Sequence, residues 1–247
     1  MKRPIWLLVL GLLLLPTVCW AQGIPTLNIG LGQANSPQQV STALQVLLVL
    51  TVLSMAPAIL LMTTAFTRIV IVLSFVRQAM GTQMMPPNQV IIGLALFLTF
   101  FIMSPVFNQI NDQALQPYLH KQITQQQALT RTVAPMRHFM LSQTSQGDIA
   151  ALMSVAKEPQ PASVKDVPTM TLIPAFMLSE LKIAFQMGFM IYLPFLVIDM
   201  VVASVLMAMG MMMLPPPIIS LPFKLLLFVL VDGWGLVVGS LVKSFTH

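Results

Sequence analysis

A cluster of methionines is the first group in this sequence whose residue types and spacing could do chemistry. Of the 20 methionines, five fall between residues 207 and 213. The Met207-x-x-x-Met211 spacing resembles the thioether pairs that bind Cu(I), so a copper transporter is one hypothesis. Against it, residues 22–42 contain no Met or His that could collect copper.

The same methionines also suit a second role, as a soft seal. Their unbranched side chains adapt to surfaces of varying shape, and a ring of such turns from several subunits would close a pore deformably. The residues that we assign to this pore gasket are Met209, Met211, Met212 and Met213. We interpret most other methionines as flexible packing residues.

Ionisable residues inside apolar segments form the second group. Each costs about 2.5–3.5 kcal/mol on membrane-insertion scales, so each needs a partner or water. These residues are Arg68, Glu180, Lys182, Asp199, Lys224 and Asp232. Asp199 and Lys224 could form an ion pair, either within one chain or between neighbouring subunits; a water-filled lumen and snorkelling are the alternatives. We expect Arg68, Glu180 and Lys182, like Asp199 and Lys224, to make polar contacts within the hairpins or between subunits. For Glu180 and Lys182, which lie near the boundary of an apolar run, solvated charges are the alternative.

Enzymatic chemistry finds little support in this sequence. It has no paired carboxylates, no Gly-x-Ser-x-Gly and no Gly-rich phosphate loop, and its three histidines lack metal-ligand spacing. We therefore expect no catalytic, cofactor or metal site; an intramembrane acid pair of Asp199 and Asp232 is the remote enzymatic alternative. The net charge of +5 is spread over 247 residues without a basic run, which argues against nucleic-acid binding.

Two copies of one turn motif would position these residues. Ala-Met-Gly, two residues, Met, one residue and Pro-Pro occur at 79–87 and again at 208–216. Glycine supplies the left-handed residue that ends a helix, and proline opens the next helix. We predict two helical hairpins whose tips contain Gly81, Pro86 and Pro87 in the first and Gly210, Pro215 and Pro216 in the second.

Composition places these hairpins in a membrane. Apolar residues make up 57% of the chain and charged residues 8%, far below the usual quarter. We expect an all-α membrane protein with four spans, its two hairpins flanking a mostly helical exported segment, assembled as an oligomeric ring. Arg68 and Arg77 favour cytoplasmic tips. Gly235 and Gly239 are spaced for close helix packing and support oligomer contacts.

Five segments follow from these patterns. Lys2-Arg3, an apolar run and small residues before Gln22 predict a signal peptide cleaved after Ala21, with an uncleaved first helix as the alternative. The only cysteine, Cys19, would leave with the signal, so we expect no disulfide. The segments are a signal peptide over 1–21, an exported strap over 22–42, a first helical hairpin over 43–107, a periplasmic, mostly helical segment over 108–170 and a second hairpin with the methionine turn over 171–247.

Several blocks of the sequence resemble the FliP family of flagellar export-gate proteins. They lie between about Met62 and Leu241 and include Thr67–Gln78, Gly93–Phe101, Ser179–Lys182, Phe195–Asp199, Gly210–Met213, Leu221–Lys224 and Val231–Trp234. The related virulence-secretion family, whose members serve injectisomes, is the alternative. The signal peptide and Arg68 followed by Ile-Val-Ile-Val favour the flagellar branch.

The resemblance implies a core channel subunit of the type III export gate, which moves unfolded flagellar subunits across the bacterial inner membrane at the flagellar basal body. It implies a homo-oligomer of five copies joined by FliQ and FliR, with FlhB and FlhA beside it and FliO needed for assembly. In such an assembly the hairpins lie partly above the bilayer, so four conventional spans would describe the newly inserted monomer. Met211, Met212 and Met213 would form the pore gasket, and Asp199 and Lys224 match polar positions of the family's hairpins.

Overall fold

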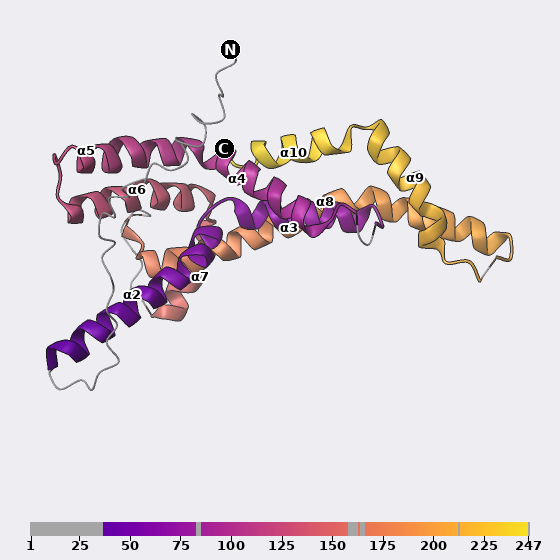
Figure 1. Cartoon of the computed structure of the whole chain (residues 1–247). Coiled ribbons are helices and arrows are strands. Elements are labelled where there is room, and N and C mark those ends of the chain that lie inside the picture. The colour runs from indigo at the N-terminus through magenta and orange to yellow at the C-terminus, as the bar shows by residue number, and fades with distance from the viewer. Residues whose placement is uncertain (1–36, 83–84, 158–162, 164–165, 212, 247) are drawn as a thin grey trace, which may run out of the picture. The chain divides into compact units, whose positions relative to one another are not determined.

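Helices form all the regular secondary structure of the computed structural model, which describes residues 37–82, 85–157, 163, 166–211 and 213–246 (Figure 1). Within these residues there is no strand, so the expected all-helical fold is confirmed. The signal peptide with Ala21, residues 22–36 of the expected strap, and Met212 lie outside the described residues.

Helix α2, Pro37–Met62, begins inside the segment expected to be a strap. Residues up to Ser54 form a unit of their own. From Leu44 onward α2 is apolar and exposed on all sides. A helix that is apolar all round needs lipid or another protein around it.

The first hairpin consists of α3, Phe66–Ala79, and α4, Asn88–Ile110. Its tip has the geometry that the sequence motif predicts. Gly81 has the left-handed φ of 75°, and Pro87 precedes the first residue of α4. With 14 residues, α3 is about 21 Å long. This is too short to cross a bilayer core of about 30 Å.

The middle segment is helical, as expected. It contains the π-helix η1, Asn111–Leu115, and the α-helices α5, Gln116–Leu119, α6, Gln125–Gln143, and α7, Gln146–Ala156. Thr124 and Gln127 form a reciprocal capping box that starts α6. In Figure 1, α6 runs back beside α5, and it packs against η1, α4 and α8. The middle segment is thereby joined to both hairpins.

The second hairpin consists of α8, Thr169–Ala208, then α9, Pro216–Leu230, and α10, Gly233–Lys243. Gly210 has φ 73°, and Pro215 caps α9. The apolar run from 218 to 242 is not one straight helix, because α9 and α10 meet at an angle of 62°. Figure 1 shows this bend. The break occurs at Asp232, whose φ of 49° cannot continue a right-handed helix.

Three described helical stretches are long and apolar enough to cross a membrane. They are Leu44–Met62, Asn88–Leu119 and Thr169–Ala208. A fourth crossing is obtained only if the bent pair α9 and α10 counts as one span. The structure therefore supports three or four spans where the sequence predicted four.

The hydrophobic core lies where α3 packs between α4 and α8. Ile69, Val72, Leu73 and Val76 follow the period of one face of α3 and are buried. This core fixes the first hairpin against the base of the second.

Candidate functional site

An ion pair joins the two arms of the second hairpin. Lys224 on α9 donates from Nζ to Asp199 Oδ2 on α8 at 2.6 Å, and Ser220 Oγ donates to the other carboxylate oxygen. The Lys224 side chain is 4% exposed and that of Asp199 28%. The sequence allowed an ion pair of Asp199 and Lys224 either within one chain or between subunits. The structure contains this pair within one chain.

The tip of the first hairpin lies beside this ion pair. A Cβ placed on Gly81 would be 3.8 Å from Lys224 Nζ. Gly81 follows Met80, the C-cap of α3, and the carbonyl end of a helix dipole favours a positive charge. Lys224 therefore receives electrostatic support from both hairpins.

A second ion pair links the first hairpin to the base of the second. Arg68 on α3 donates from Nε to Glu180 Oε2 on α8 at 2.9 Å, and its Nη2 donates to Oε1. The side chains are 1% and 0% exposed. Glu180 therefore makes a polar contact with the first hairpin, and the alternative of a solvated Glu180 is wrong, because α3 packs on α8 and brings the Arg68 guanidinium to it. Lys182, by contrast, is exposed.

The methionine turn of the second hairpin is held by the backbone and leaves its side chains free. Met211 N donates to Leu206 O and Gly210 N to Met207 O, both at 3.0 Å, which is the Schellman pattern of a helix C-terminus. Met209 is 56% exposed and Met213 98%. The backbone at this helix end is therefore held by hydrogen bonds, while the thioether side chains of Met209 and Met213 are unpacked.

The two matching tips have different surroundings. Met80 in the first motif corresponds to Met209 in the second, yet Met80 is 4% exposed. Arg77 also fixes the first tip, because its Nη1 donates to the Pro86 carbonyl and to Asn88 Oδ1. Sequence repetition therefore yields one anchored tip and one free tip.

The predicted packing glycines of α10 have no helix against them within the described chain. Nothing lies within 4 Å of a Cβ placed on Gly239, and the three atoms nearest to a Cβ placed on Gly235 belong to the Asp232 carboxylate. Their role in packing between subunits stays a prediction.

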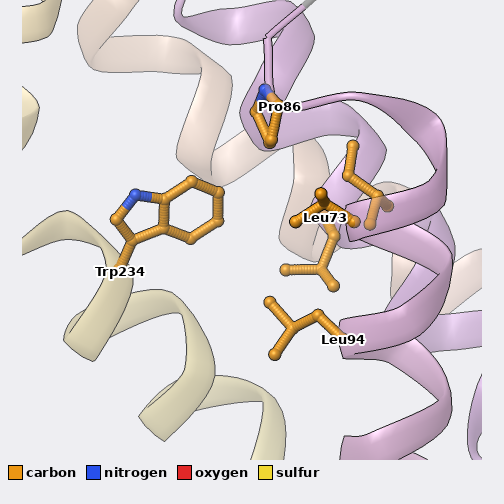
Figure 2. Close-up of a pocket in the computed structure, with 6 residues that line it drawn as sticks. Leu73, Pro86, Leu94 and Trp234 are labelled. Carbon is orange, nitrogen blue, oxygen red and sulfur yellow. The ribbon is translucent and has the colours of Figure 1, made fainter.

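Nothing in the described part of the chain supplies a catalytic or metal-binding constellation. No group of three His, Cys, Asp or Glu residues that could hold a metal occurs there. A small pocket between the first hairpin and α10 has Trp234 on one side and Pro86, Leu73 and Leu94 opposite it (Figure 2). Its wholly apolar lining offers no group that could transfer a proton or attack a substrate.

Sequence reasoning missed several polar partners of these ion pairs. Ser220 could have been found, because it lies four residues before Lys224 and so on the same helix face. Gln143 and Ser244, which accept hydrogen bonds from Arg68, give no such signal. They come from distant segments that only the folded chain brings together.

The fold and these contacts define a class of protein: an all-helical protein with several helices suited to a bilayer, whose buried charges pair between helices. The model of the FliP family matches residues 49–241 of the chain. The flagellar biosynthetic protein FliP of Bacillus subtilis (strain 168) is 59% identical over 217 residues, which cover 88% of this chain and 98% of the relative. The FliP proteins of Pectobacterium carotovorum subsp. carotovorum and Aquifex aeolicus (strain VF5) are 52% and 49% identical, over 96% and 90% of this chain and 92% of each relative.

The chain belongs to the FliP family. It is therefore a protein of flagellum biosynthesis and not an enzyme.

Proposed function

We propose that this chain is a core channel subunit of the flagellar type III export gate, in which the methionine turns of several copies meet and seal the pore. The observation that carries the proposal is the free second tip: its backbone is fixed, while Met213 is 98% exposed. An exposed apolar side chain on a rigid turn needs a partner surface, and the same turn from a neighbouring copy is a self-complementary one.

The length of α8 supports assembly with other subunits. Its 40 residues extend about 60 Å, twice the thickness of a bilayer core. Only 11% of the most apolar 18-residue stretch of α8 is buried within the chain. Phe185, Phe189 and Met200 are among the exposed residues of this helix. Because a bilayer can cover only part of this surface, other protein chains must cover the rest.

The composition of the assembly comes from the family resemblance. We propose five copies of this chain with FliQ and FliR, in contact with FlhB and FlhA, assembled with the help of FliO in the bacterial inner membrane. The transported substrates would be unfolded flagellar subunits. Identities of 49–59% to flagellar relatives favour this machine over a virulence injectisome.

The proposed mechanism follows from the properties of methionine. In the idle gate, flexible thioether side chains from several copies fill the constriction and exclude hydrated ions. An arriving unfolded chain displaces them, and they close around its side chains whatever their size. The fixed backbone of the turn keeps the seal in place while its side chains move.

Replacing Met211, Met212 and Met213 together with Ala tests this function. The shorter side chains should leave the closed pore open to ions, so ion conductance of the purified assembly in a planar bilayer should rise clearly above that of the parent. Met190→Ala is the matched control, because Met190 is 72% exposed on the side of α8 and away from the turn. Unchanged conductance together with normal secretion in the triple variant would contradict the proposal.

A further inference from the structure

The Arg68 guanidinium has all five of its N–H groups engaged in a buried site. Besides its two bonds to Glu180, Nη2 donates to Gln143 Oε1 at 3.1 Å, and Nη1 donates to Ser244 O at 2.9 Å and to Ser244 Oγ at 3.0 Å. A guanidinium has five donors in total. The site is therefore complete only when α3, α6, α8 and the segment after α10 are all in place.

The segment after α10 also closes the site sterically. The Phe245 ring lies 3.9 Å from Arg68 Cζ, over the face of the guanidinium. The same ring stacks on Phe139 of α6, and the Phe245 carbonyl accepts a bond from Gln143 Nε2 at 3.4 Å. Phe245 is 9% exposed, whereas Thr246 next to it is exposed. The contact with Arg68 thus ends at residue 245.

Helix α10 lies between a bend at one end and this closure at the other. It buries Val237 and Leu241 but leaves its Leu236 face exposed. At its other end the left-handed Asp232 separates it from α9. Helix α10 is therefore held by its buried side chains and by the docked segment that follows it.

We propose that Ser244 and Phe245 act as a clasp: by docking on Arg68 they lock α10 against the first hairpin and the middle segment. When the clasp is open, Arg68 keeps its bonds to Glu180 and Gln143, so α3 and α8 stay together while α10 is released. The clasp is thus a local switch for α10 at the end of the second hairpin. It does not depend on whether the methionine turn seals a pore.

Hydrogen exchange of the purified full-length protein, measured by mass spectrometry, tests the clasp. A shortened chain that ends at Lys243 should exchange the α10 amides at least about tenfold faster than the parent, while amides of α4 keep their protection. A chain that ends at Phe245 is the matched control and should exchange like the parent.

Two results would overturn the proposal. One is parent-like exchange of α10 in the chain that ends at Lys243. The other is equally faster exchange in α4 and α10, which would mean general loss of stability instead of a local release. If the shortened chain cannot be purified, Phe245→Ala together with Ser244→Ala removes the ring and the hydroxyl group from the clasp and leaves only the Ser244 carbonyl on Arg68. This variant should also speed α10 exchange, and the same two results would count against the proposal.

Discussion

Gly188 allows α3 and α8 to pack closely, because a Cβ at this position would lie 2.5 Å from Phe75 Cδ2. Phe75 itself is held in an edge-to-face contact with Phe185, with ring centroids 5.5 Å apart. The ring therefore has little room to move away from a larger residue at 188. This close approach brings Arg68 within reach of Glu180 on the same pair of helices.

Gly188→Ala should lower stability by about 1–3 kcal/mol, the usual cost of inserting a methyl group into a packed core. Gly93→Ala in α4 is the matched control, because nothing lies within 4 Å of its Cβ position. Ala is also the better helix former, so the control should be neutral or stabilising. Thermal unfolding in detergent compares the two; equal stability of both variants would mean that α3 and α8 do not approach as described.

Asp199 and Lys224 should respond unequally to truncation. Asp199→Ala leaves a nearly buried ammonium without its partner and should cost about 3–5 kcal/mol. Lys224→Ala should cost less, because the remaining carboxylate is partly exposed and keeps its bond from Ser220. Unfolding temperatures of the two variants give the comparison, and a larger loss for Lys224→Ala would contradict this order.

Exchanging the two charges tests the pair directly. Asp199→Lys together with Lys224→Asp should restore assembly that either single reversal abolishes, since the pair joins two arms of one chain. Recovery of the assembled complex from membranes is the measurement. A double variant no better than the single ones would show that each residue needs a different partner.

The helices and turns show what the sequence could predict. Local signals sufficed for both glycine-proline tips and for the capping box of α6, because their chemistry lies within a few residues. The break at Asp232 escaped prediction, because apolar residues continue on both sides of it. The sequence gives no sign that Asp232 adopts a left-handed conformation. Arg68 and Glu180 lie 112 positions apart, so no local pattern could reveal that they pair.

The bend between α9 and α10 should depend on the residue at position 232. A β-branched side chain is poorly tolerated in the left-handed conformation, whereas Asn adopts it readily. Asp232→Val should therefore be less stable than Asp232→Asn by about 1–2 kcal/mol. Thermal unfolding of the two variants checks this, and equal stability would show that the bend does not require a left-handed residue.

As a single chain, the molecule leaves a large apolar surface exposed. Apolar side chains remain exposed along α4, α8 and α9, among them Phe97, Phe101, Val201, Phe223 and Leu226. The buried ion pairs are already satisfied within the chain, so the unmet need is apolar contact. Composition predicted this need, but which surfaces face lipid and which face other subunits depends on chains that the sequence does not contain.

Cross-linking at the free tip tests most directly whether the methionine turns of neighbouring copies meet. In a chain with Cys19→Ser, Met213→Cys treated in membranes with a short thiol-specific cross-linker should give covalent multimers of this chain. Val155→Cys, on α7 at 78% exposure against 98% for Met213, is the control and should stay monomeric. Monomeric Met213→Cys, in membranes where the assembled complex is present, would contradict the account, because the turns would then not share a pore.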